Sequence, residues 1–285
     1  MATIAFLGTG LLGGAFAEAA ATRGDTVTAW NRSADKVAQL AQFGVKAAAT
    51  PADAVRGAAR VHIVLKDDAV VDEVIAAARP GLAPDAVLID HTTTLPELTA
   101  ARAQRLQAQG LKYLHCPVFM GPPAARKAQG SMMVAGPQAL FDSVKSELAA
   151  MTGRLEFMGE RPDLAAANKL FGNAMIICLS GAMADVLTLA QASNVDGLDA
   201  IKLLGWLDLN GMVGARGPKM AKGEFTPPSF ELSMARKDVR LMLETTGSRP
   251  MAVLPGVAAR MDQLIAAGHG SKDASVVALD AAKRG

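Results

Sequence analysis

Residues 3–13 read TIAFLGTGLLG, and this stretch decides the fold. The apolar run over residues 3–7 predicts a buried strand, and a helix is predicted over residues 12–22. The turn between them is a GxGxxG pattern made of Gly8, Thr9, Gly10, Leu11, Leu12 and Gly13. Glycine at its three positions permits a tight turn, brings a pyrophosphate against the backbone and lets helix and strand pack closely, while the helix N-terminus offers free N–H groups. The stretch therefore predicts a dinucleotide-binding strand–turn–helix unit, with an unliganded tight turn as the alternative.

The alternation of strand and helix continues along the first half of the chain. Further apolar runs predict strands at residues 26–30, 61–65, 87–90, 111–116, 132–135 and 154–158. The segments between them predict helices at residues 34–43, 69–78, 97–109 and 138–150. Because parallel strands that are buried on both faces are apolar throughout, this pattern predicts an α/β fold with a doubly wound, Rossmann-type parallel sheet.

The pattern changes at Arg161-Pro162. Asp163 is a suitable N-cap for a long helix that reaches about Ser193. Shorter helices are predicted at residues 198–204, 212–222, 230–246, 257–267 and 274–283, and no strand is predicted in this half. We therefore expect an N-terminal nucleotide-binding domain over residues 1–161 and an all-α domain for substrate binding and oligomerisation over residues 162–285.

Composition excludes several classes of protein. The chain has 285 residues, of which 51% are hydrophobic, and its 29 basic and 27 acidic side chains give a net charge of +2, which predicts a packed core and no nucleic-acid partner. Two cysteines and the lack of a Cys/His cluster predict neither a disulfide scaffold nor a metal site. The N-terminus has no basic targeting region. The most apolar run, residues 170–184, is interrupted by glycines and polar side chains and is judged too short to span a membrane, so we expect a cytoplasmic protein.

The end of the second predicted strand indicates which dinucleotide binds. An enzyme specific for NAD usually has Asp or Glu there, which binds the ribose 2′-hydroxyl. This strand is followed instead by Asn31, Arg32 and Ser33. A guanidinium can pair with a 2′-phosphate through two hydrogen bonds, and the serine hydroxyl can donate another. The sequence therefore predicts NADP as the cofactor, with NADPH preferred over NADH; a solvated surface arginine is the alternative.

Lys169 and Asn173 stand in the apolar first half of the long predicted helix. Four residues apart, they share one face of that helix. A lone lysine in such surroundings usually extends its ammonium group to water. A lysine at a cleft instead has its charged form disfavoured, and it can then exchange protons near neutral pH. The pair is therefore a candidate for acid–base chemistry.

Together these motifs resemble the β-hydroxyacid dehydrogenases, the family of 3-hydroxyisobutyrate dehydrogenase and the glyoxylate/succinic semialdehyde reductases. The resemblance covers essentially the whole chain, and it is specific because the motifs follow the family's order and spacing. They are the glycine-rich turn at residues 8–13, Asn31-Arg32-Ser33, Asp90-His91-Thr92-Thr93, Cys116-Pro117-Val118 with Gly121, Lys169 with Asn173, Ala235-Arg236-Lys237-Asp238, and Gly268-His269-Gly270 with Asp273.

The resemblance implies a catalytic role for three positions. Lys169 would protonate the carbonyl oxygen as hydride reaches the substrate, and it would accept the proton in the reverse direction. Asn173 would hold the substrate or orient Lys169. Thr93 would contact both the nicotinamide half of the cofactor and the substrate.

The resemblance also implies that three more residues bind the cofactor. Leu65 and Lys66 would lie against it, although the family usually has proline where this chain has Lys66. Lys237 would reach it from the helical domain, and an ion pair with a neighbour such as Asp238 is the alternative role for this lysine.

The segment Val118-Phe119-Met120-Gly121 would contact the substrate, and it departs from the family pattern. The family commonly has Ser-Gly-Gly after this valine, where a hydroxyl and backbone N–H groups receive a carboxylate. Phe119 cannot donate a hydrogen bond, Met120 replaces a glycine, and the two prolines that follow have no N–H group. We therefore expect the site to bind a small carboxylate less well and an apolar group better. The alternative is that these side chains face the interior.

The sequence thus predicts an NADP-dependent oxidoreductase that interconverts a β-hydroxyacid, or a related alcohol, and its aldehyde or ketone. An NADPH-dependent imine reductase is one alternative, since such enzymes resemble this chain in the Asn-Arg-Ser stretch and in the apolar loop, although they typically have Asp or Tyr at the position of Lys169. A non-catalytic NADP-binding scaffold is an alternative of another class. The expected partners are a small carbonyl or hydroxy substrate and further copies of the chain in a homodimer or homotetramer, because the Ala- and Met-rich helices predict a large apolar self-contact.

Overall fold

The computed structural model describes residues 2–282, which divide between Asn173 and Ala174 into two compact units. The boundary between the units falls inside the long helix α8 (Leu164–Ala192). The sequence places a domain boundary between residues 161 and 162, just before this helix begins. That domain assignment stays a prediction.

The first unit is built on one sheet, whose strands are β1 (Thr3–Leu7), β2 (Thr26–Trp30), β3 (Lys46–Ala47), β4 (Arg60–Ile63), β5 (Val87–Asp90), β6 (Lys112–His115), β7 (Val118–Phe119), β8 (Ser131–Ala135) and β9 (Arg154–Gly159). Their order is β3-β2-β1-β4-β5-β6-β8-β7, with β9 beside β8. The strands from β3 to β6 are parallel, as predicted. Beyond them β8 runs antiparallel to both β6 and β7, so the sheet is parallel in its nucleotide-binding half and mixed at one edge.

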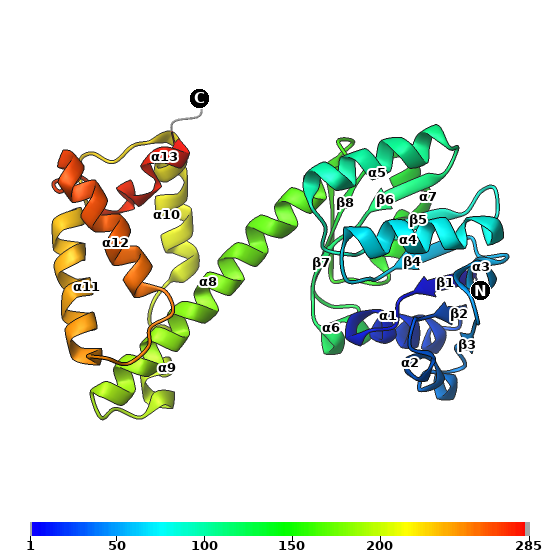
Figure 1. The fold of residues 1–285 in the computed structure, drawn as a ribbon, viewed down its shortest axis with the longest axis horizontal. Helices are drawn as coiled ribbons and strands as arrows, with labels where there is room; N and C mark the ends of the chain where they lie inside the picture. The colour runs from blue at the N-terminus through cyan, green and yellow to red at the C-terminus, as the bar shows by residue number, and fades with distance from the viewer. Residues whose placement is uncertain (1, 283–285) are drawn as a thin grey trace. The chain divides into compact units, whose positions relative to one another are not determined.

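Helices cover both faces of this sheet (Figure 1). Phe16 and Phe141 belong to the buried cluster on one face, and Val74 and Leu106 to the cluster on the other. The doubly wound architecture predicted from the sequence is therefore confirmed. The helices are α1 (Leu11–Thr22), α2 (Ala34–Ala38), α3 (Pro51–Val55), α4 (Asp68–Ala78), α5 (Pro96–Ala108), α6 (Pro122–Arg126) and α7 (Gln138–Ala149).

The shortest elements of this unit differ from the prediction. Strands β3 and β7 and helices α3 and α6 span two to five residues each, which is too short to show a hydrophobic period. The helix predicted over residues 34–43 is two pieces, α2 and a 3₁₀ turn over Ala41–Phe43, which ends at Gly44 with a φ of 87°.

Helix α8 runs unbroken for 29 residues and confirms the predicted long helix to within a residue at each end. By length and composition it is able to cross a membrane. The sequence-based judgement that its apolar run is too short for this is therefore wrong. The helix continues through the glycines and polar residues that interrupt residues 170–184, because single residues of these kinds cost a helix only about 1 kcal/mol or less.

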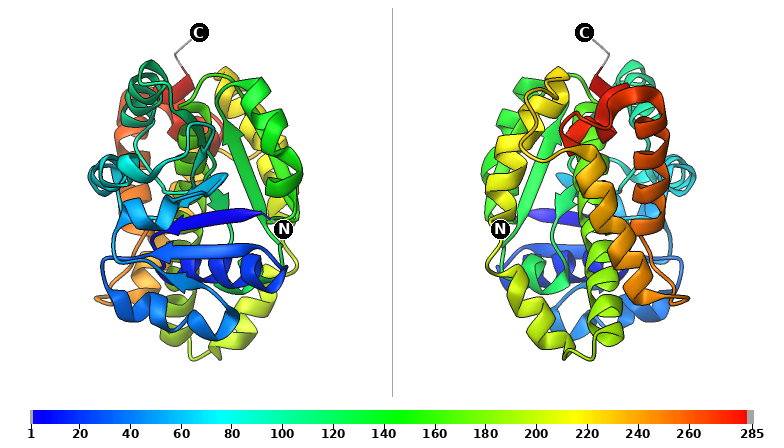
Figure 2. Two further views of the ribbon diagram at one scale, coloured as in Figure 1. Left: turned by 90° about the vertical axis from the view of Figure 1, so that its right-hand side faces the viewer. Right: turned by 90° about the vertical axis from the view of Figure 1, so that its left-hand side faces the viewer.

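The second unit is helical, with α9 (Gly197–Leu204), α10 (Leu209–Lys222), α11 (Leu232–Thr246), α12 (Leu254–Leu264) and α13 (Leu279–Ala282) following α8. Helix α11 packs along α12 around buried Leu232, Val239 and Met261 (Figure 2). The helix predicted over residues 257–267 ends at Leu264 in a π-helical turn. The one predicted over residues 274–283 is a 3₁₀ segment followed by α13, and residue 283 lies outside the described part.

Two carboxylates brace this unit internally. Asp185 of α8 is buried and accepts hydrogen bonds from three successive backbone N–H groups, those of residues 252–254, where α12 begins. Asp273 accepts from the backbone and hydroxyl groups of Ser229 and Ser275. Although burial raises the pKa of each carboxyl, these donors outweigh it and hold both pKa values below the usual range.

Candidate active site

A cavity of about 490 Å³ lies where the parallel strands of the first unit end. The segments after β1, β2, β4 and β5 meet there, at the carboxyl edge of the sheet, where doubly wound folds bind their ligands. Its lining includes nearly all of the cofactor-binding residues predicted in this unit, namely Gly8, Gly10, Leu11, Leu12, Gly13, Asn31, Arg32, Ser33, Leu65, Lys66 and Thr93. The fold therefore brings together segments that are up to 85 residues apart in the sequence.

The glycines of the turn have two different roles. Gly10 leaves space for a ligand, whereas Gly8 and Gly13 allow close approach of neighbouring backbone. A Cβ at Gly10 would meet nothing within 4 Å, so this position opens towards the cavity. A Cβ at Gly8 would strike the carbonyl oxygen of Val64, and Gly8 has a φ of +98°. A Cβ at Gly13 would strike the carbonyl oxygen of Gly8. The turn thus fits a pyrophosphate approaching the N-terminus of α1.

Asn31 braces the turn. Its Oδ1 accepts a hydrogen bond from the N–H of Thr9 at 3.0 Å, and its Nδ2 donates to the carbonyl of Ser33 at 3.1 Å. Arg32 and Ser33 beside it are exposed at the mouth of the cavity. Within residues 2–282, Arg32 pairs only with Glu73, at 3.7 Å and with both side chains exposed, so the guanidinium is available to a ligand.

Sequence reasoning missed Lys36, which lines the same cavity. It stands three residues after Ser33 on α2, and residues at this spacing are neighbours on a helix. This spacing is the signal that would have found it. Lys36 adds a second exposed cation beside Arg32.

Hydrogen bonds of the buried residues Asp90 and Thr92 fix the loop that carries Thr93. Thr92 accepts a hydrogen bond on its Oγ1 from the N–H of Leu65 at 3.1 Å, and it donates its own N–H to Asp90 at 2.9 Å. The hydroxyl of Tyr113 also donates to Asp90 at 2.9 Å. Burial raises the pKa of Asp90, and these donors oppose that rise. Thr93 itself is exposed, which suits a residue that contacts ligands.

The two lysines expected at the cofactor differ in their settings. Lys66 lines the cavity with an exposed side chain, 3.7 Å from Asp67. Lys237 lies on α11 in the second unit, and its Nζ is 2.9 Å from Asp238. An ion pair with Asp238 is the alternative role that the sequence offers for Lys237. The cofactor role of Lys237 stays a prediction.

Lys169 is buried, with 9% of its surface exposed, in the first turns of α8. Burial lowers the pKa of its ammonium group. Its Nζ lies 4.1 Å from the centre of the Phe119 ring, so a residue of the predicted substrate segment contacts the predicted catalytic lysine. Asn173 is partly exposed one turn further along the same helix.

The rest of the substrate segment divides between interior and surface. Val118 is buried in β7 and Met120 is partly buried against the main hydrophobic cluster, while Gly121 is exposed and precedes α6. Val118 therefore faces the interior, while Phe119 is partly exposed and also packs against buried Met133, Ala135 and Ala165. The substrate role of this segment stays a prediction.

Buried histidines lie in and next to the strands of this sheet, and His91 lines the cavity. His62 Nδ1 is 3.0 Å from His91 Nε2, and His91 Nδ1 is 2.7 Å from the carbonyl oxygen of Cys116. Burial lowers the pKa of His91 to about 4 and that of His115 to about 3, so both rings are neutral at pH 7. His62 and His91 pack against each other and brace the strands that carry them.

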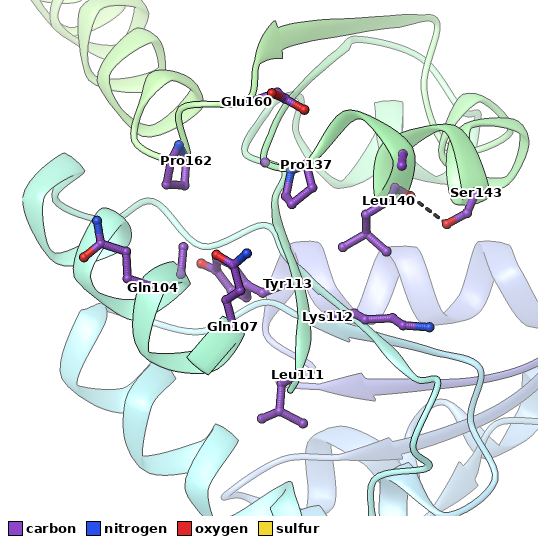
Figure 3. A pocket seen from close by; sticks show the side chains of 13 residues that line it. Gln104, Gln107, Leu111, Lys112, Tyr113, Pro137, Leu140, Ser143, Glu160 and Pro162 are labelled. Carbon is purple, nitrogen blue, oxygen red and sulfur yellow. Dashed lines mark hydrogen bonds between the residues drawn. The ribbon is translucent and has the colours of Figure 1, made fainter. Parts of the chain in front are cut away.

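A larger cavity, of about 650 Å³, lies between α5 and α7 (Figure 3). Its two charged side chains already have partners in the structure. Lys112 donates to Asp85 at 2.7 Å, and Glu160 accepts from the N–H of Gln138 at 3.1 Å. None of the predicted site residues lines it. The smaller cavity at the carboxyl edge is therefore the candidate site.

Known proteins resemble this chain in sequence and in fold. Residues 3–159 match the NAD-binding domain of 6-phosphogluconate dehydrogenase. The 3-sulfolactaldehyde reductase of Escherichia coli (strain K12) is 28% identical over 97% of this chain and 95% of its own length. Glyoxylate/succinic semialdehyde reductase 1 of Arabidopsis thaliana is 27% identical over 87% of this chain and 88% of its own length. The imine reductase from Myxococcus stipitatus, solved with NADP+, has a TM-score of 0.87 at 19% identity, over 96% of this chain and 98% of that one.

These matches confirm the resemblance to β-hydroxyacid dehydrogenases with imine reductase-like features. The matched domain covers the whole nucleotide-binding sheet and its glycine-rich turn, and members of the family bind a nicotinamide dinucleotide. The chain therefore belongs to the family of oxidoreductases that share the NAD-binding domain of 6-phosphogluconate dehydrogenase.

Proposed function

We propose that this protein is an NADPH-dependent reductase that interconverts an alcohol or hydroxyacid and its carbonyl form, with Lys169 as the proton donor. The observation that carries the proposal is the buried Lys169, whose pKa is lowered, in the same unit as a cavity shaped for a dinucleotide. A lysine that gives up its proton readily is suited to general acid–base catalysis near neutral pH.

The cavity's residues fit NADPH, which when bound supplies the hydride. The residue at position 31 is a neutral asparagine that is bonded to the glycine-rich turn. Because it is not a carboxylate, it does not repel a phosphate. Arg32, Ser33 and Lys36 would hold the 2′-phosphate at the cavity mouth. The imine reductase of similar fold was itself solved with NADP+, which supports the same choice here.

Lys169 would supply the proton that balances hydride transfer. As the carbonyl carbon gains hydride, its oxygen would take a proton from the Nζ of Lys169 and become a hydroxyl. The lysine is left as a neutral amine, which regains a proton from water. Asn173, one turn away, would hold the substrate oxygen or the amine in line. Oxidation of the alcohol would reverse these steps.

Replacing Lys169 with Met tests the proposal. We expect kcat for NADPH-dependent reduction of a panel of aldehydes and ketones to fall by about 10² or more, while the Kd for NADPH is unchanged. In the wild-type enzyme, reduction should weaken as pH rises through the pKa of Lys169, which burial places below that of an ordinary lysine, and oxidation should strengthen. Lys127→Met, at an exposed lysine of the same unit, is the matched control. Full activity of the Lys169 variant would refute the assignment.

The imine reductase alternative is supported by the fold comparison and by the apolar Phe119. A cyclic imine in the same panel tests it, and turnover of the imine above that of every carbonyl would favour it. Tight NADPH binding with no turnover of any compound would favour the non-catalytic scaffold.

We also propose that a second copy of the chain covers the apolar side chains along α8 and its neighbours. Phe171 and Ile177 of α8 are each 68% exposed in the single chain, and Trp206 is 82% exposed. Exposed apolar surface of this kind marks an interaction site.

A further inference from the structure

The aromatic ring of Phe119 covers the ammonium group of Lys169. The ring centre lies 4.1 Å from Nζ, within the range of a cation–π contact. Phe119 is placed there by the short strand β7, which pairs with β8 through Val118 and Phe119. The lysine is buried, so the ring accounts for part of its cover and also offers it the negative face of a π system.

Gly172 makes room for this ring on α8. A Cβ at Gly172 would lie 2.6 Å from Cε1 of Phe119 and closer still to Cζ. Any side chain at this position would therefore displace the ring. Since Gly172 follows Lys169 by three residues, the notch lies beside the lysine on the same helix face. The ring is seated over one turn of α8, from Lys169 to Gly172.

The loop that follows the ring offers a carboxylate few donors. Phe119 has no donor, and Gly121 is followed by Pro122 and Pro123, which have no N–H groups. A carboxylate that approached Lys169 from the side of Phe119 would have to expel the ring and lose its contact with the ammonium. A substrate with an apolar substituent would instead pack against the ring while its carbonyl oxygen reaches Nζ.

We propose that Phe119, seated in the notch at Gly172, makes this enzyme selective for uncharged aldehydes and ketones with an apolar substituent and no carboxylate. The inference rests on the proposed function, because it assumes that Lys169 protonates a carbonyl oxygen. It narrows the substrate to a chemical class and names the residue that sets it.

A matched pair of aldehydes tests the selectivity in the full-length enzyme with NADPH. Butanal and succinic semialdehyde share a four-carbon chain and an aldehyde, and only the second has a carboxylate. We expect the wild-type enzyme to have the higher kcat/KM for butanal. We expect Phe119→Ser to shift the ratio towards succinic semialdehyde by about tenfold or more, because it removes the ring and adds a hydroxyl donor. Phe43→Ser, at an exposed phenylalanine outside the cavity lining, should leave the ratio unchanged.

Two further variants distinguish the effect of where the Phe119 ring lies from the effect of having an aromatic ring at all. Gly172→Ala keeps Phe119 but displaces its ring, so it should shift the substrate ratio in the same direction as Phe119→Ser. Phe119→Leu keeps an apolar cover but removes the π face that favours the ammonium, so the high-pH limb of the reduction profile should move down by about one pH unit. Thermal melts of both variants establish that they are folded before kinetics are compared.

Each outcome bears on one proposal. A wild-type preference for succinic semialdehyde, or a ratio that neither Phe119→Ser nor folded Gly172→Ala changes, would overturn the role of Phe119 and leave Lys169 as the acid. Failure of the wild-type enzyme to reduce any aldehyde or ketone would overturn the proposed function itself.

Discussion

At the mouth of the dinucleotide cavity, single charged residues determine which cofactor fits. Arg32 is exposed and only loosely paired with Glu73, and Lys36 stands beside it. Neither has an acidic neighbour among the residues that line the cavity. An excess of positive charge at this point favours the dinucleotide that has the additional phosphate.

Replacing Arg32 with Ala tests this charge. We expect the Kd for NADPH to rise by about tenfold or more, because a charge-assisted pair with the 2′-phosphate is lost, while the Kd for NADH stays the same. Fluorescence titration of both dinucleotides measures the two constants. Arg56→Ala, at an exposed arginine outside the cavity lining, is the control. Equal weakening of both dinucleotides would place Arg32 elsewhere than at the phosphate.

At the residue scale, site residues within a contiguous motif could be predicted from the sequence. Contacts between residues that are far apart in the chain could not. The glycine-rich turn and Asn31-Arg32-Ser33 could be assigned because strand, turn and helix are contiguous. Lys36 was missed because it lies outside these contiguous motifs, one helical turn further along α2. The contact between Phe119 and Lys169 joins residues 50 positions apart, and no spacing rule gives the direction of an aromatic ring across that distance.

At the scale of elements, a buried arginine fastens two helices that support the site. Arg102 of α5 is fully buried and bonds to Asp72 at 2.6 Å and to Asp68 at 2.8 Å, both on α4. Helix α4 follows the loop of Leu65 and Lys66, and α5 follows the loop of Thr93. The arginine thus ties together the elements that follow two loops lining the cavity.

Removing Arg102 should destabilise the first unit strongly. We expect Arg102→Ala to lower the free energy of unfolding by about 3–5 kcal/mol, because two carboxylates lose a buried partner. Arg105→Ala is a matched control, since Arg105 bonds the same Asp72 at 2.7 Å but is about half exposed, and it should cost about 1 kcal/mol or less. Urea unfolding measures both. A similar cost for the two variants would show that burial does not set the strength of this cluster.

Elements with a clear hydrophobic period could be predicted, and those fixed by tertiary pairing could not. Strands β1, β2 and β5 begin and end at the predicted residues. Strand β7 has two residues and exists because it pairs with β8. The reversal of β8 relative to β6 likewise depends on where the chain returns, which an apolar run does not encode.

At the scale of the whole molecule, the exposed apolar side chains of α8 lead us to expect self-association. A single chain has a mass of 29.4 kDa. We expect light scattering at micromolar concentration, without detergent, to give two or four times this mass, and Ile177→Glu to reduce it, because a charge cannot be buried in an apolar contact. Lys202→Glu, at an exposed lysine of the same unit, should leave the measured mass unchanged. A single-chain mass for the wild-type protein would contradict the proposal, and co-sedimentation with lipid vesicles would assign α8 to a membrane.

The seat of Phe119 against Gly172 constrains the order in which these positions can change over evolutionary time. While Phe119 is present, a side chain at position 172 meets its ring, so the substitution displaces the ring and changes the site. Once position 119 carries a small residue, we expect the same substitution to have little effect there. We therefore expect the effects of substitutions at the two positions to be epistatic, with the effect at position 172 depending on the residue at position 119.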